Sequence, residues 1–173
     1  LLHELRITDV KYVACTDNDS YHPGRCAKAY AGETYLGVFG QIHPLVAANY
    51  GMDTEVYTAE LSFDAMYEKR GGIPVYQPLP KFPAVTRDIA VVCDEAVTVG
   101  ALEESIRRGA KGLLKDVSLF DIYRGPGVAI GKKSVAFNLV LRADDRSLTG
   151  EEADEDVQSI LAALKADHNA VLR

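Results

Sequence analysis

The chain lacks the sequence signals of several protein classes. Its three cysteines, Cys15, Cys26 and Cys93, include no CxxC pair, so neither a disulfide framework nor a zinc site is indicated. No apolar run approaches the roughly 20 residues that a membrane-spanning helix needs. The first residues also lack the basic start and apolar block of a secretory signal. These absences favour a cytoplasmic protein with no membrane segment.

Basic residues are also outnumbered by acidic residues. The 173 residues include 19 Lys and Arg against 25 Asp and Glu, which gives a formal net charge of -6. Because domains that coat nucleic acid are usually basic, we expect no DNA binding, and any contact with RNA must be local. The sequence has no initiator Met and begins like the tail of a helix, so we expect a piece of a longer polypeptide.

Motifs for catalysis are missing as well. The sequence has no Walker loop, no GxGxxG and no Ser/His/Asp arrangement, and the glycines at 125, 127 and 131 do not have phosphate-loop spacing. His22 and His43 stand beside prolines without a third ligand or a nucleophile, so we assign them to turns. The acidic cluster at 151–156 lies where a helix is predicted to begin, and negative charge there complements the helix dipole. We therefore predict neither catalysis nor a metal site in this chain.

A Pro- and Gly-rich segment divides the chain in two. The segment GGIPVYQPLPKFP at 71–83 holds two glycines and four prolines. The prolines lack the backbone N–H that donates hydrogen bonds within a sheet, and they favour extended backbone. We predict domains at 1–77 and 78–173. The first contains strand-like runs and one short helix ended by a glycine, which predicts an antiparallel-sheet fragment with little helix; these elements lie at 11–15, 26–30, 35–40, 44–50 and 55–63.

The second domain has a clearer order. Thr98 is a good N-cap for one helix, and Thr149 with Glu152 forms a capping box for another. Strand patterns at 88–93, 117–124 and 134–142, with a last strand near the C-terminus, complete the order βαββαβ. This order predicts a ferredoxin-like fold in an α+β protein. Two helices on one side of four strands leave the other side bare, as in RRM-type modules that stack bases.

Alternation along the strands predicts which residues lie on the bare face. Along 119–123, we place Leu119, Asp121 and Tyr123 on the bare face and leave Phe120 and Ile122 to the core. The same rule gives the outward residues of the strands at 134–142 and 88–93, which are Ser134, Ala136, Asn138, Arg142, Asp88, Ala90 and Val92. The small residues among them leave room beside the tyrosine for a flat ligand.

The bare face suits the recognition of one nucleotide. The Asp121 carboxylate can accept two hydrogen bonds from the Watson–Crick edge of guanine, and Tyr123 can stack on a base. Cations at the domain's loops and C-terminus can meet phosphate, namely Arg124, Lys132, Lys133, Arg142 and Arg173. From the residues alone, a solvated strand and a solvated hairpin end remain open as simpler interpretations.

Several motifs in one order carry a family resemblance: YHPGRCA at 21–27, YLGVFGQIHP at 35–44, AELSF at 59–63, FPAVTRDIAVV at 82–92, LFDIYRG at 119–125, GKKSVAF at 131–137, LTGEE at 148–152 and the final LR. They resemble the C-terminal region of the β subunit of bacterial phenylalanyl-tRNA synthetase. The first three resemble the end of its catalytic-like module, which has lost its own active site. The others resemble its ferredoxin-fold anticodon-binding domain.

The resemblance implies roles for single residues. The family places the anticodon loop of phenylalanine tRNA, whose anticodon starts with guanine, on the exposed sheet of this domain. By motif, Asp121 and Tyr123 become the base-reading pair, Ala90 and Ser134 line the same patch, and Arg173 supplies a cation. The remaining cations, Arg124, Lys132, Lys133 and Arg142, are possible contacts to the RNA backbone.

The resemblance also implies an assembly. In it, αβ heterodimers pair into an (αβ)2 enzyme that attaches phenylalanine to its tRNA with ATP and magnesium, and the chemistry resides in the α subunit. This chain would then be a non-catalytic part without its own cofactor, with residues 1–77 as scaffold. Two alternatives are a βαββαβ regulatory domain that binds a small molecule at loops or helix edges, and a purely structural interaction module.

Overall fold

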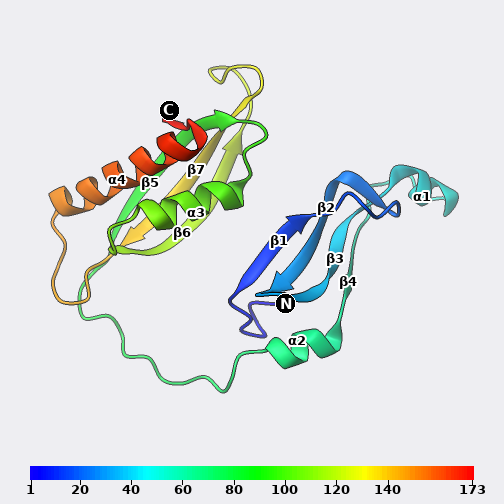
Figure 1. Cartoon of the computed structure of the whole chain (residues 1–173), viewed down its shortest axis with the longest axis horizontal. Helices are drawn as coiled ribbons and strands as arrows, with labels where there is room; N and C mark the ends of the chain where they lie inside the picture. Colours follow the sequence, from blue (N-terminus) through cyan, green and yellow to red (C-terminus); the bar gives the residue numbers. More distant parts are fainter. The chain divides into compact units, whose positions relative to one another are not determined.

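Two four-stranded antiparallel sheets organise the chain. The computed structural model describes residues 1–173, which divide into one unit at Leu1–Gln77 and another at Pro78–Arg173 (Figure 1). Helices accompany each sheet, so the predicted α+β class is confirmed. No helix combines the length and the apolar composition needed to cross a membrane.

The first unit contains its strands in chain order, β1-β2-β3-β4, at Val10–Ala14, Tyr21–Ala31, Thr34–Ile42 and Tyr57–Leu61. Helix α1 (Pro44–Asn49) begins at His43, whose ring nitrogen Nδ1 accepts a hydrogen bond from the Leu45 amide at 3.2 Å. Helix α2 (Phe63–Lys69) begins at Ser62 and is missing from the sequence prediction. The turn predicted around His22 is wrong, because that segment lies inside β2, with a register shift between Tyr21 and Cys26.

The second unit has the predicted βαββαβ order. Its elements are β5 (Val85–Asp94), α3 (Val99–Gly109), β6 (Leu114–Tyr123), β7 (Lys132–Leu141), α4 (Gly150–His168) and β8 (Val171–Leu172). The predicted caps are both present: Thr98 accepts from the Ala101 amide, and Thr149 and Glu152 form the reciprocal capping box. The spatial strand order is β6-β7-β5-β8, so β6 and β8 are the two edges of the sheet.

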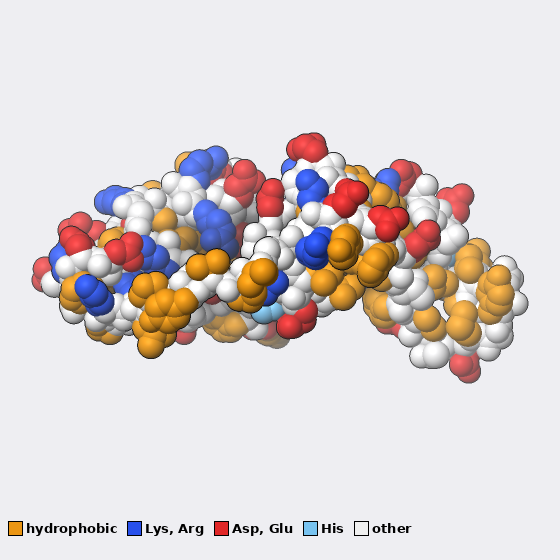
Figure 2. Space-filling view, turned by 90° about the horizontal axis from the view of Figure 1, so that it is seen from below, with side chains coloured by type: hydrophobic (Ala, Val, Ile, Leu, Met, Phe, Trp, Pro, Cys, Tyr) orange, Lys and Arg blue, Asp and Glu red, His pale blue; other side chains and the backbone are white.

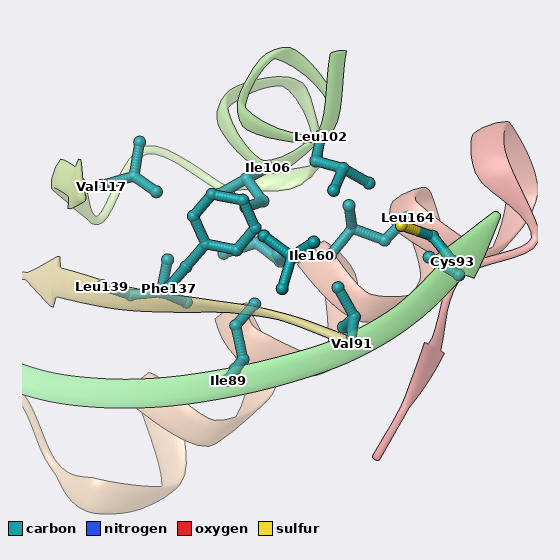
Figure 3. Close-up of a cluster of buried hydrophobic side chains, with 12 residues drawn as sticks. Ile89, Val91, Cys93, Leu102, Ile106, Val117, Phe137, Leu139, Ile160 and Leu164 are labelled. Carbon is teal, nitrogen blue, oxygen red and sulfur yellow. The ribbon is translucent and has the colours of Figure 1, made fainter. Parts of the chain in front are cut away.

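Both helices of this unit cover the same side of its sheet (Figure 1). Val135, Phe137 and Leu139 of β7 are fully buried against them, with Ile106 of α3 and Ile160 of α4. Figure 3 shows Phe137, Leu139, Ile106 and Ile160 gathered between the strands and the helices. Because side chains alternate along β7, Ser134, Ala136 and Asn138 lie on the opposite side, which no helix covers.

A β-bulge in β6 changes the predicted faces of two residues. Leu119 pairs with Phe137, but Asp121 pairs with Ala136, so Phe120 is an extra residue between them. Leu119 therefore shares the helix side with Phe137, and Phe120 is 60% exposed instead of lying in the core. The sequence prediction is wrong for both, because a bulge interrupts the alternation on which it depends. Asp121 lies on the bare face as predicted.

The two helices approach each other closely at Gly109, the last residue of α3. A Cβ atom there would lie 2.7 Å from the Ala163 Cβ and 3.1 Å from the Ile160 Cα. Both distances are shorter than ordinary van der Waals contact, and both atoms belong to the body of α4. The absence of a side chain at Gly109 therefore sets the spacing of the helix pair.

Gly109→Ala should lower the stability of the second unit by about 1 to 3 kcal/mol, the usual cost of overpacking a core. Gly100→Ala is the matched control, since a Cβ there meets open space in the same helix, and it should stabilise by up to about 1 kcal/mol. Urea unfolding of both variants measures the difference. Equal stabilities would contradict the close packing at Gly109.

The middle of α3 and the C-terminal end of α4 are joined by a serine, a histidine and an aspartate. The buried Ser105 hydroxyl donates to Asp167 Oδ2 at 2.7 Å, and His168 Nε2 lies 3.0 Å from the same Ser105 Oγ. His168 Nε2 also lies 3.2 Å from the Ala101 carbonyl oxygen, which can only accept a hydrogen bond, so Nε2 carries the ring proton. The imidazole therefore cannot act as a general base that accepts the serine proton. The serine itself is only 3% exposed. The three side chains therefore connect the two helices and do not form a catalytic triad.

The hydrogen bond from Ser105, together with the neighbouring Arg108 guanidinium, holds the pKa of Asp167 below its ordinary value. A carboxylate with a lowered pKa contributes stability above its unfolded pKa, about 3.9, and that stability is lost as the pH falls through the lower folded value. Ser105→Ala should therefore reduce the loss of stability between about pH 6 and about pH 2.5. Thermal unfolding at both pH values measures this, with the exposed serine variant Ser118→Ala as control. An unchanged pH dependence in Ser105→Ala would contradict the assignment.

Candidate nucleic-acid interface

Residues from three strands and the C-terminal Arg173, which follows β8, meet in two adjacent rows on the bare face. Asp121, Ala136 and Ala90 are successive partners across β6, β7 and β5, and the Arg173 amide donates to the Ala90 carbonyl oxygen at 2.8 Å. In the next row, Tyr123 pairs with Ser134, and Ser134 pairs in turn with Val92, again across β6, β7 and β5. The structure thus brings together the five residues that the sequence assigns to a base-reading patch.

Tyr123 and Arg173 meet above the middle strands, although they belong to opposite edges of the sheet. The Arg173 guanidinium carbon lies 4.9 Å from the centre of the Tyr123 ring, a cation–π contact. Ser134 and Ala136 are only 3% and 9% exposed, although no helix covers them. We attribute this burial to the tyrosine and arginine side chains that extend over the small residues. Small side chains in these rows are what allow two long ones to lie across the sheet.

The Asp121 carboxylate is free on this face. It is exposed and makes no side-chain hydrogen bond or ion pair. Further along the sheet, Asp88 accepts a hydrogen bond from the Asn138 amide nitrogen Nδ2 at 2.7 Å. Asp121 therefore offers both carboxylate oxygens as acceptors, whereas one oxygen of Asp88 is already engaged.

The cations of the predicted rim are mostly engaged by acidic partners. Arg124 forms a two-pronged pair with Glu95 at 2.6 to 3.0 Å, and Lys132 pairs with Asp94 at 2.7 Å. The hydrogen bonds between Arg124 and Glu95 raise the pKa of the guanidinium and lower that of the carboxyl. The rim is therefore close to electrically neutral.

Two of the predicted cations lie away from the patch. Lys133 is 6% exposed, points to the helix side by alternation, and donates from Nζ to the Glu95 carbonyl oxygen at 2.9 Å. Arg142 lies eight residues beyond Ser134 along the same chain direction, a separation of about 26 Å for extended backbone. Neither position suits a contact beside Tyr123, so Arg173 is the one predicted cation near the patch without an acidic partner.

The face shown in Figure 2 has no extended basic area, because acidic and basic side chains are interspersed on it. Three acidic residues of α4 have partners within this unit: Asp154 pairs with Arg87, Glu152 pairs with Arg146, and the buried Asp156 accepts from the Lys111 amide at 2.6 Å. No group of three or more His, Cys, Asp or Glu side chains is arranged to hold a metal ion.

A helix-edge pocket of the kind that a regulatory domain would use is not favoured. The hollow of about 700 Å³ along α4 is lined by polar and charged residues, which are Lys111, Glu151, Asp154, Glu155, Gln158 and Ser159. Small-molecule sites are usually concave and mostly apolar, with a few convergent polar groups. No large aliphatic or aromatic side chain lines this hollow.

Comparison with known proteins gives a consistent result for both units. Residues 80–173 match the family described as ferredoxin-fold anticodon binding domain, and residues 1–63 match phenylalanyl tRNA synthetase beta chain CLM domain. Similar proteins include the phenylalanine–tRNA ligase beta subunits of Clostridium tetani (39% identity over all 173 residues, 22% of the relative), Symbiobacterium thermophilum (43% over 166 residues, 96% of this chain and 18% of the relative) and Bacillus subtilis (38% over all 173 residues, 21% of the relative). The chain spans about a fifth of the length of these relatives.

Proposed function

Because the chain belongs to the ferredoxin-fold anticodon-binding domain family, as part of a phenylalanyl-tRNA synthetase β subunit, we propose that the bare face of its second unit reads the first anticodon base of phenylalanine tRNA. The observation that carries this proposal is the free Asp121 carboxylate beside Tyr123, over a floor of small residues. A partly exposed aromatic next to an unengaged acceptor pair is an arrangement that can recognise an unstacked base.

Each residue of the patch has a distinct task in this proposal. The two oxygens of Asp121 accept the N1–H and N2–H hydrogens of guanine, and the Tyr123 ring stacks on the base. Ala90 and Ser134 keep the floor low enough for the base to approach. The Arg173 guanidinium stabilises a neighbouring phosphate.

The wider assembly is proposed from the same premise. Residues 1–77 are the end of an inactive catalytic-like module, a scaffold that joins the anticodon-binding domain to the rest of the subunit. The complete enzyme is a cytoplasmic (αβ)2 heterotetramer that joins phenylalanine to its tRNA, with ATP and magnesium bound by the α subunit. In this assembly the contribution of the chain is to hold and position the tRNA.

Two variants test the base-reading pair in a titration of the chain with the anticodon stem-loop of phenylalanine tRNA. Tyr123→Ala should weaken binding by roughly 1 to 3 kcal/mol, the range for one stacked base, whichever base comes first in the anticodon. Asp121→Ala should reduce the preference for guanine over adenine at that position, because adenine lacks the N1–H and N2–H groups that donate hydrogen bonds to the carboxylate.

Asp116→Ala is the matched control for the aspartate. It removes the same charge from the same strand and face, since Asp116 pairs with Val140 near the other end of β6, about 16 Å from Asp121 for five extended residues. It should leave the guanine preference intact. If Asp121→Ala instead weakens all stem-loops equally, Asp121 does not read the base.

The engaged cations lead to a further prediction, on salt dependence. With Arg173 as the single unpaired cation of the patch, the plot of log K against log salt concentration should have a slope near -0.7, the value for one phosphate contact on a single strand. Five independent contacts would give a slope of about -3.5. Fluorescence titrations of the stem-loop at several salt concentrations measure the slope, and a value near -3.5 would show that the paired cations also bind phosphate.

A further inference from the structure

The loop after β6 contacts the phenol end of Tyr123. A Cβ atom built on Gly125 would lie 2.7 Å from the Tyr123 hydroxyl oxygen, 2.9 Å from Cζ and 3.4 Å from Cε2. The same hydroxyl donates to the Pro126 carbonyl oxygen at 3.2 Å. The ring tip therefore packs directly on the backbone of the loop, in space that any other residue at position 125 would fill.

Backbone conformation does not explain this glycine. Gly127 and Gly131, in the same loop, have φ angles of +90° and +81°, which favour glycine whatever surrounds them. Gly125 has no positive φ, so alanine fits its backbone without strain. The feature that requires glycine at 125 is the position of the Tyr123 ring.

The ring is thus held at two places. Its tip lies against the loop, and the Arg173 guanidinium lies 4.9 Å from its centre. An aromatic side chain on an exposed edge strand otherwise rotates among several rotamers. Contacts at tip and face select one orientation before any ligand arrives, which reduces the entropy that binding must lose.

We propose that Gly125 is a positioning residue for base stacking, acting through Tyr123. This inference rests on the proposed anticodon-reading function and deepens it: a flat ligand, an unstacked nucleobase, finds the ring already oriented. Gly125 itself touches no part of the ligand, and its effect comes from the space that it leaves for the phenol.

Gly125→Ala in the full chain is the direct test. The added methyl group meets the far end of a side chain that can move, so the fold should remain stable while the ring changes orientation. In the free protein, the NMR signals of the Arg173 side chain should lose the shift that a ring 4.9 Å away imposes. Stem-loop affinity should fall between about fivefold and about 150-fold, the range for one stacked base.

Two comparisons separate positioning from a general structural effect. In the Tyr123→Ala background, Gly125→Ala should change affinity by less than about twofold, because contacting residues in one network are non-additive. Gly100→Ala, whose added methyl group meets open space on α3, should change neither the Arg173 signals nor the affinity. Equal effects of Gly125→Ala in the two backgrounds would overturn the proposal.

The free-protein measurement distinguishes the two levels of the argument. If the wild-type chain does not bind the stem-loop but Gly125→Ala still moves the Arg173 signals, the anticodon function fails and the placement of the ring stands. If the Arg173 signals do not move and the affinity is unchanged, Gly125 does not position Tyr123.

Discussion

The burial of one side of the second sheet beneath α3 and α4 is the constraint on which the proposed RNA site depends. Phe137 and Leu139 are fully buried there, and the absence of a side chain at Gly109 lets both helices fit over the strands. The burial of each such apolar side chain stabilises the fold by roughly 1.5 to 3 kcal/mol. The core therefore decides which side of the sheet is bare, and strand alternation then places Asp121 and Tyr123 on it.

The sequence predicts the parts of this arrangement that depend on local patterns. Large apolar residues at every second position of β7 identify its buried face, and the caps at Thr98 and Thr149 identify both helix starts. The bulge at Phe120 has no such local signal, since FDIY contains no glycine and the extra residue is defined only by the partners of β6 in β7. The faces of Leu119 and Phe120 could therefore not be predicted, although Asp121 and Tyr123 were placed on the bare side.

Charge partners are the second part that the sequence does not reveal. It shows that Arg124, Lys132 and Lys133 lie near one loop, but their partners, Glu95 and Asp94, come from the end of β5. Lys133 illustrates the difficulty. A lysine is normally expected at the surface, yet the aliphatic part of this side chain is buried and its ammonium group donates to a main-chain oxygen. The contact between Tyr123 and Arg173 likewise joins opposite edges of the sheet, and only the tertiary fold brings them together.

A patch of this kind is suited to discrimination more than to tight binding. One stacked base contributes roughly 1 to 3 kcal/mol, and hydrogen bonds to a charged acceptor contribute about 1.5 to 3 kcal/mol each. With one unpaired cation nearby and a net charge of -6, counterion release adds little. An orientation fixed in advance by Gly125 and Arg173 then matters, because a small interaction energy is easily lost in ordering a mobile ring. In the proposed function, the bulk of tRNA affinity therefore comes from surfaces outside this patch, and the task of the patch is to distinguish guanine from other bases.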